Sequence, residues 1–228
     1  MTLPVLQIYA SIECPYAYLA TYRLRQLYSE YEDRLQLVWR ALPLEYINHA
    51  SYPKPLFDAE RDLFAKIEPN LPFNPWGQAE WQWPTTFWPA FEALACAQAQ
   101  GEQAGMEYSW ELRFAFFAQS QNISMRHILI MIAESVAAKN QMYFHRFESD
   151  FNSGLYKRSV LGESWRGWHD LKLPGSVTFV LPDRRKITNP AIGKVDFDET
   201  TMTVRSYTPF AGDPLQRYRA LLNDIVGC

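Results

Sequence analysis

The sequence predicts an α/β fold in which two groups of strands are separated by a long helical block. A strand–helix–strand pattern occupies residues 5–43, and strand character returns at residues 176–181. Between them, helical periodicity dominates residues 89–170. The chain has 228 residues, of which 48% are hydrophobic, so it can bury the core of one large domain or of a domain with an insertion.

The charge pattern excludes several classes of partner. The net charge is −3, with both signs spread along the chain, and no basic stretch is interleaved with aromatic residues. We therefore expect no nucleic-acid partner. No apolar run reaches the ~18 residues that cross a bilayer, so we expect no membrane partner either. The first residues, MTLPVL, lack the shape of a signal peptide, which favours a cytoplasmic protein.

The cysteines do not form a disulfide framework. Cys14, Cys96 and Cys228 are odd in number and far apart, which fits a reducing compartment. No set of cysteines and histidines has zinc spacing, so we expect no metal. Cys96 lies among alanines and is expected in the core, whereas Cys228, the last residue, is expected to be mobile.

Cys14 is the first candidate for chemistry. The apolar run at residues 5–10, VLQIYA, predicts a buried strand, and a helical stripe follows from Ala20 onward. Pro15 suits the first turn of that helix, which places Cys14 at its N-terminus. Unpaired N–H groups and the macrodipole there favour a thiolate, so Cys14 is a candidate nucleophile. The alternative is a small buried hydrophobe, and an ionised Glu13 would oppose the thiolate.

The second strand is expected at residues 35–43, parallel to the first. Residues 46–89 are rich in proline and tryptophan and predict a long irregular connection with one short helix over 58–67. The tryptophans could cover a pocket, but we favour the interpretation that they hold the connection against the core. They are Trp76, Trp81, Trp83 and Trp88.

Helices are expected over residues 89–101, 107–120, 125–139, 141–151 and 153–170, the last with weak points at Gly154 and Gly162. His127 and His145 lie in this block, and we expect surface or core roles rather than catalysis. Residues 176–188 predict a β-hairpin, and residues 195–207 are ambiguous. A closing helix over 213–226 begins with Asp213 as N-cap. The expected division is 1–50, 51–171 and 172–228.

Four stretches in this order carry a resemblance to a known family. They are CPYAYL at 14–19, LVWRALPL at 37–44, RFAFF at 113–117 with NIS at 122–124, and GSVTFVLPD at 175–183 followed by NP at 189–190. Together they resemble the DsbA-like thioredoxin superfamily, in particular its FrnE-like oxidoreductases, 2-hydroxychromene-2-carboxylate isomerases and kappa-class glutathione transferases. The resemblance implies a thioredoxin-like fold with a large α-helical domain inserted in the middle, 51–171, between core halves 1–50 and 172–228.

The resemblance also implies site residues. Cys14 takes the nucleophile's position, and Pro15, Tyr16 and Ala17 complete the active-site turn. Ala17 stands where the oxidoreductases have a second cysteine, so a self-contained dithiol cycle is not expected.

The stretch opposite the active site is Ser176, Val177 and Thr178, whose backbone pairs with substrate or glutathione in the family. The family usually has a cis-proline where Val177 stands. Because a cis bond before a non-proline residue costs about 2.5–4 kcal/mol, we expect a trans bond here.

Three functions stay open at this point. The first is a monothiol oxidoreductase in which Cys14 forms a mixed disulfide with glutathione or a protein thiol. The second is a glutathione-dependent isomerase or transferase in which Cys14 orients the glutathione thiol and the tryptophans shape a site for an aromatic substrate. The third is a non-catalytic binding protein. An enzyme is favoured, with glutathione as co-substrate, and the oligomeric state is left open between monomer and homodimer.

Overall fold

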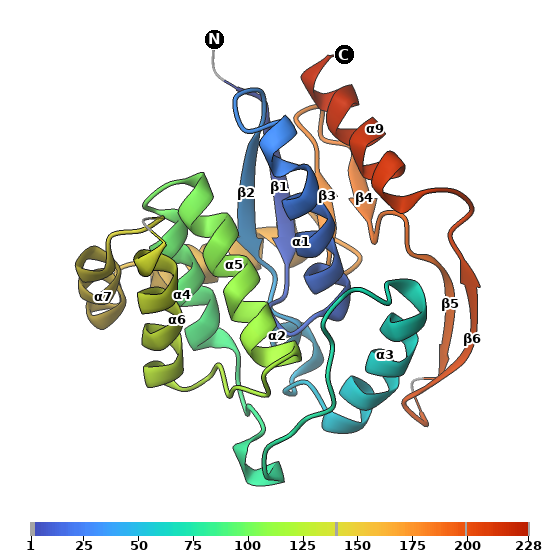
Figure 1. Ribbon diagram of the computed structural model, residues 1–228, viewed down its shortest axis with the longest axis horizontal. Coiled ribbons are helices and arrows are strands. Elements are labelled where there is room, and N and C mark those ends of the chain that lie inside the picture. The colour runs from blue at the N-terminus through green and yellow to red at the C-terminus, as the bar shows by residue number, and fades with distance from the viewer. Residues whose placement is uncertain (1–2, 140, 199, 228) are drawn as a thin grey trace.

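A computed structural model describes residues 3–139, 141–198 and 200–227. Its central sheet has the strand order β2-β1-β3-β4 (Figure 1). The parallel pair is β1 (Val5–Ala10) with β2 (Gln36–Ala41), joined through α1 (Pro15–Leu27) and a short turn of 3-10 helix, η1 (Tyr28–Glu30). The antiparallel strands are β3 (Thr178–Val180) and β4 (Lys186–Thr188). The predicted strand–helix–strand unit and the predicted hairpin are both confirmed.

Helices cover both faces of this sheet. Alternation along β1 sends Leu6 and Ile8 to the face of Phe179, whose ring meets Tyr218 of α9 (Pro214–Val226) edge-on at 5.9 Å. In Figure 1, α1 and α9 lie on the same side of the sheet. Tyr9 faces the other way, towards the π-helical turn η3 (Arg166–Asp170), where an added Cβ on Gly167 would come within 3.1 Å of its ring.

The helical block packs beside β2 and is built on α5, which contacts α1, α4 and α6. Its helices are α4 (Trp88–Gln98), α5 (Glu102–Phe117), α6 (Arg126–Ala138), α7 (Phe144–Ser153) and α8 (Lys157–Trp165). The helix expected over 153–170 is present, but it begins at Lys157 rather than at Ser153. Gly154 adopts a φ of +66°, which ends α7, and α8 then begins at Lys157 and continues into η3.

The long connection is more ordered than expected. It contains α2 (Leu44–Asn48), α3 (Lys54–Ile67) and the 3-10 turn η2 (Glu80–Gln82). Trp83 packs edge-on against Phe57 at 5.1 Å and against Trp76 at 4.8 Å between ring centroids, and Phe57 is fully buried. The interpretation that tryptophans hold this connection to the core is confirmed for Trp76 and Trp83, whereas Trp81 is 82% exposed.

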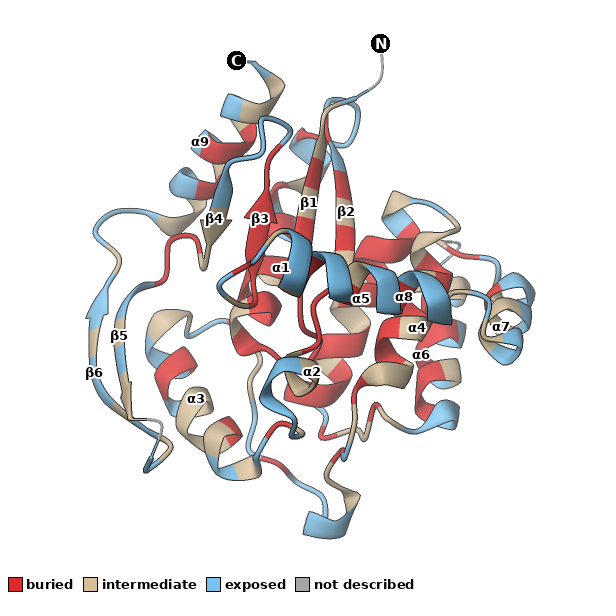
Figure 2. Cartoon of the chain, turned by 180° about the vertical axis from the view of Figure 1, so that it is seen from behind, coloured by how far each residue is buried: buried red, intermediate tan, exposed pale blue. Residues whose placement is uncertain are grey.

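Of the ambiguous stretch, residues 195–198 and 203–207 belong to a second, two-stranded sheet, β5 (Gly193–Asp198) and β6 (Thr203–Pro209). Figure 1 shows this sheet beside α3, and α3 contacts β6. The predicted cap of the closing helix is confirmed, because the Asp213 carboxylate accepts from the N–H groups of Leu215 and Gln216 at 2.8 and 3.3 Å. Buried residues concentrate where the sheet meets α1 and α5 (Figure 2). The division into 1–50, 51–171 and 172–228 stays a prediction.

Candidate active site at Cys14

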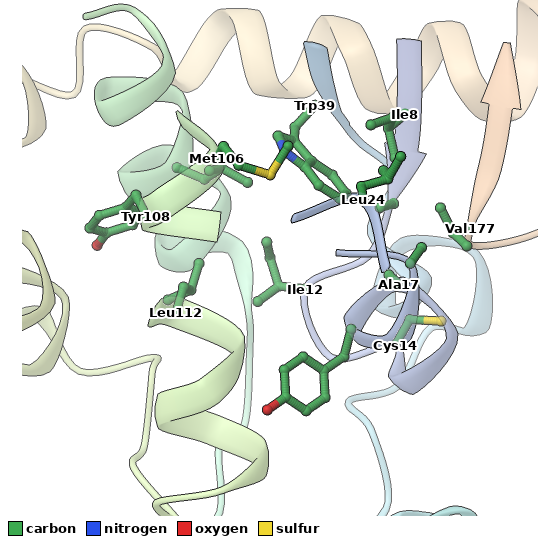
Figure 3. Close-up of a cluster of buried hydrophobic side chains, with 14 of the residues drawn as sticks. Ile8, Ile12, Cys14, Ala17, Leu24, Trp39, Met106, Tyr108, Leu112 and Val177 are labelled. Carbon is green, nitrogen blue, oxygen red and sulfur yellow. The ribbon is translucent and has the colours of Figure 1, made fainter. Parts of the chain in front are cut away.

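Cys14 is the N-cap of α1. Its φ and ψ of −80° and 120° are extended, Pro15 follows in the first turn, and its carbonyl accepts from the N–H of Tyr18 at 3.0 Å. The predicted helix start is therefore confirmed. The side chain is only 2% exposed, and it lies beside the start of α1 with Ala17 and Val177 nearby (Figure 3).

The loop that precedes β3 lies opposite Cys14. The Ser176–Val177 peptide is cis, so the expectation of a trans bond was wrong. Asn189 fixes this loop from one side, since its side chain accepts from the Val177 N–H at 3.2 Å and its own N–H donates to the Val177 carbonyl at 3.0 Å. From the other side, the Ser11 N–H donates to the Ser176 hydroxyl at 2.8 Å. The expectation of a trans bond was based on an isolated peptide and did not take these hydrogen bonds from the rest of the fold into account.

The Cys14 thiol donates to the carbonyl of Ser176 at 3.5 Å. A cavity of about 240 Å³ opens beside it. The expected site residues that line this cavity are Cys14, Pro15, Tyr16 and Ser176. Those that instead pack into the protein are Ala17, Val177 and Thr178, each at most 1% exposed. The Thr178 hydroxyl donates to the Gly175 carbonyl at 2.7 Å and lies 2.8 Å from the Thr188 hydroxyl, so it stabilises the hairpin.

Three carboxylic acids line the same cavity: Glu13, Glu45 and Glu60. Glu60, in α3, accepts a short hydrogen bond from the Tyr52 hydroxyl. Sequence reasoning had considered only Glu13. Glu60 and Tyr52 come from the proline-rich connection, where no pattern pointed to the site, and only the fold of α3 across the cavity brings them to Cys14.

The Cys14 thiol is protonated at neutral pH. Burial, the largest cause, together with the nearby Glu60 and Glu13 carboxylates raises its pKa to about 12. Hydrogen bonds at Ser176 and the Ala17 N–H act in the opposite direction but are outweighed. The expectation that the helix N-terminus gives a low-pKa thiolate was therefore wrong, because loss of solvation exceeds the effect of the helix.

Two of the carboxylic acids titrate near neutrality. Burial raises the pKa of both Glu13 and Glu60 to about 7. Glu13 is fully buried; its Oε2 accepts from the Ser11 hydroxyl at 2.5 Å, and no described residue bonds to its Oε1. The cavity thus holds acids whose protonation changes in the range where most enzymes work.

Arg113 of α5 braces the chain just before Cys14. It is fully buried, donates to the Ser11 carbonyl at 3.3 Å and to the Ser109 hydroxyl at 2.6 Å, and lies over the Trp39 ring at 4.9 Å. Burial lowers its pKa to about 10. This residue belongs to the stretch at 113–117 that carried the family resemblance, and its contacts give that stretch a structural role.

The aromatic segment does not shape this cavity. Trp76, Trp81, Trp83 and Trp88 are absent from its lining, whose aromatic side chains are Tyr16 and Tyr52. The alternative in which these tryptophans shape a site for an aromatic substrate is therefore not supported at this cavity. His127 and His145 are exposed on α6 and α7, away from the cavity. Among the described residues, no group of acidic, histidine or cysteine side chains could hold a metal ion. The expectation for Cys228 lies outside the described residues.

The fold and site define a class of protein: a thioredoxin-type sheet, a helical insertion, and a cysteine at the N-terminus of the first helix facing a cis peptide. The DSBA-like thioredoxin domain matches residues 5–160, and the chain belongs to that family. A search of curated proteins finds no match. Across the described residues, no helix is both long enough and apolar enough to span a membrane.

Solved structures share the fold at low identity. A candidate protein disulfide isomerase from Nitrosomonas europaea is 16% identical with a TM-score of 0.65, covering 98% of this chain and 97% of the other. The cytosolic disulfide reductase DsbM from Pseudomonas aeruginosa is 19% identical with a TM-score of 0.60, covering 80% and 87%, and has also been solved with GSH. A 2-hydroxychromene-2-carboxylate isomerase is 15% identical with a TM-score of 0.57, covering 81% and 88%. At these identities the similarity establishes the fold.

Proposed function

We propose that this protein catalyses thiol–disulfide exchange through a single cysteine, Cys14. The observation that carries the proposal is that Cys14 lines a cavity at the helix start, opposite the cis peptide at Ser176. The other described cysteine, Cys96, is 1% exposed in α4 and does not line that cavity. Ala17 removes the resolving partner, so an external thiol has to complete each cycle.

The exchange begins with loss of the Cys14 proton, for which the carboxylates of Glu13 and Glu60 are the neighbouring acceptors. The sulfur then attacks one sulfur of a disulfide R–S–S–R. The R–S–S–R bond breaks, the Cys14–S–S–R bond forms, and the departing R–S⁻ takes up a proton. Cys14 is oxidised and one R sulfur is reduced. A different thiol, R′–SH, then attacks the R sulfur of the mixed disulfide. The Cys14–S–S–R bond breaks, R–S–S–R′ forms, and Cys14 takes back a proton.

Glutathione is the reference thiol for this proposal, and a protein thiol is the larger alternative. Support comes from a structural relative, DsbM, that was solved with GSH. A reducing, cytoplasmic setting would supply that thiol. Because the Cys14 pKa lies near 12, exchange is expected to be slow below pH 7 and to accelerate with rising pH.

The test is intact mass after incubation with oxidised glutathione between pH 6 and 9.5. It is made on the chain with Cys14 and Cys96 intact, on Cys14→Ser and on Cys96→Ala, all three with Cys228→Ser so that the terminal cysteine adds no mass. We expect addition of one glutathione that grows with pH, is absent in Cys14→Ser and persists in Cys96→Ala. Addition to Cys14→Ser as fast as to the chain with Cys14 intact would refute the assignment of Cys14.

A glutathione-dependent isomerase or transferase is the second candidate. One observation favours it: the protonated Cys14 thiol lines the cavity as a hydrogen-bond donor. In that mechanism Cys14 orients the glutathione sulfur and is never oxidised. The variant Cys14→Ser distinguishes the two mechanisms. If the protein is an isomerase or transferase, the variant keeps non-covalent glutathione binding and activity. If the protein catalyses thiol–disulfide exchange, the variant loses its activity. Absence of both adduct and binding would favour a non-catalytic protein.

A further inference from the structure

The cavity beside Cys14 has a charge character that glutathione does not match well. Its lining contains the carboxylic acids Glu13, Glu45 and Glu60 but no lysine, arginine or histidine. Glutathione carries two carboxylates and one ammonium group, so one of its charges would be matched here and two would be opposed. A site built for its carboxylates would be expected to offer a basic side chain or free N–H groups.

Glu45 serves the structure rather than a ligand. One of its oxygens accepts from the Thr86 hydroxyl at 2.8 Å, and the other accepts from the Phe87 N–H at 2.9 Å. These bonds fasten α2 to the start of α4. Both oxygens are therefore already engaged, although the negative charge remains beside the cavity.

Glu13 and Glu60 each keep an oxygen without a partner. Oε1 of Glu13 is buried and has no hydrogen-bond partner among the described residues. In Glu60, Oε2 accepts from Tyr52, and nothing in the described part of the chain bonds to Oε1. Neither acid forms an ion pair with a described basic side chain within 4.0 Å. A carboxylate oxygen that leaves water without a donor or a cation is unfavourable, so the buried Oε1 of Glu13 lacks what a ligand cation would supply. The half-buried Glu60 places a second carboxylate at the same cavity.

We propose that the thiol or disulfide accepted at Cys14 carries an amino group close to its sulfur, and that the ammonium binds between Glu13 and Glu60. This inference rests on the proposed exchange at Cys14 and names its substrate class: small aminothiols and their disulfides. With cystamine, the disulfide bond breaks, Cys14 becomes disulfide-linked to one aminoethanethiol group, and the second is released as the free aminothiol. The Cys14 proton ends on the released sulfur.

An ammonium bound between Glu13 and Glu60 would also explain how Cys14 can ionise although carboxylates surround it. An ammonium group between Glu13 and Glu60 neutralises the charges that oppose ionisation of the thiol. A cationic substrate thus favours deprotonation of the nucleophile it reacts with, whereas an anionic substrate adds to the opposition. Charge therefore selects among substrates at the step of binding and again at the step of attack.

The test compares cystamine with hydroxyethyl disulfide, a neutral disulfide of similar size, by mass spectrometry of the Cys14-containing peptide after reaction at pH 8 and an acid quench. An ammonium group near the sulfur also makes a thiol a better leaving group, so cystamine reacts faster even without a binding site. The rate with cystamine relative to the rate with hydroxyethyl disulfide is therefore divided by the same ratio measured on a short cysteine peptide. We expect a corrected ratio of at least tenfold for the native chain. In Glu60→Gln it should fall at least threefold, and in Glu134→Gln, on the exposed surface of α6, it should not change.

The outcomes separate this inference from the proposed function. Reaction of both disulfides at Cys14 with a corrected ratio near one, or a ratio unchanged by Glu60→Gln, would overturn the charge preference and leave the exchange intact. Reaction of neither disulfide, in protein that retains native circular dichroism, would overturn the exchange itself and the preference with it. The ratio is the readout, so a general loss of rate in Glu60→Gln does not enter the comparison.

Discussion

The protonated state of Cys14 makes a quantitative prediction for its reactivity. At pH 7 a thiol with a pKa of about 12 is ionised in roughly one molecule in 10⁵, against roughly one in 30 for a free cysteine with a pKa of about 8.5. The more basic thiolate is intrinsically more nucleophilic, which returns about 25- to 60-fold over this difference in pKa. Cys14 should thus react about 50- to 120-fold more slowly than a free cysteine, before any restriction of access.

The assay is reaction with dithiodipyridine from pH 6 to 10, with an acid quench and quantification of the Cys14 peptide by mass spectrometry. The urea-unfolded chain provides the reference rate for an ordinary thiol. In the folded protein the rate should rise about tenfold for each pH unit throughout this range, because the pKa lies above it.

Two results would refute this reasoning. A plateau below pH 9 would mean that the pKa is not raised. A rate at pH 7 within threefold of the unfolded chain would mean that the thiol is neither protonated nor shielded as the structure indicates. The slope with pH is the stronger criterion, since limited access lowers every rate equally and leaves the slope unchanged.

Three further predictions concern stability, each measured by urea unfolding. Glu13 has a pKa of about 7 in the folded chain and near 4.5 in the unfolded chain, so the free energy of unfolding should fall by up to about 3 kcal/mol as the pH rises from 4.5 to 7. In Glu13→Gln this fall should be smaller by that amount, and parallel pH curves for the two proteins would contradict the prediction. Phe57→Ala should lower the free energy of unfolding by about 3–5 kcal/mol, whereas Trp81→Ala, at an 82% exposed position, should change it by no more than about 0.5 kcal/mol. Equal losses in the two variants would refute the packing described for the connection. Gly167→Ala places a Cβ 2.5 Å from a methyl carbon of Leu42 and should lower the free energy of unfolding by about 1–3 kcal/mol. Gly162→Ala meets nothing within 4 Å and should stabilise α8 by up to about 1 kcal/mol, and the opposite order would be inconsistent with η3 lying against the sheet.

Local patterns were enough to predict the sheet and the position of Cys14. The apolar run before Cys14, Pro15 in the first turn and the Asp213 cap each act within a few residues, so their effects do not depend on the rest of the fold. Gly154 was expected inside the start of a helix, although as a weak point, because a glycine within a periodic pattern does not reveal whether it will adopt a positive φ.

The chemistry of the site depended on contacts that no local pattern contains. The cysteine pKa depends on burial and on Glu60, which lies 46 residues further along the chain at the other side of the cavity. The cis bond at Val177 is accompanied by hydrogen bonds from Asn189 and Ser11, two segments that only the assembled fold brings together. Sequence reasoning therefore located Cys14 at the start of α1 and misjudged its protonation state.

The central claim is that Cys14 is the residue that exchanges thiols. Peptide mapping after incubation with hydroxyethyl disulfide at pH 9, followed by addition of free mercaptoethanol, tests it most directly. The account predicts a mixed disulfide on the peptide that contains Cys14, none on the peptide that contains Cys96, and full return of Cys14 to the free thiol. An adduct confined to another cysteine, or an unmodified Cys14 while the unfolded chain reacts fully, would contradict it.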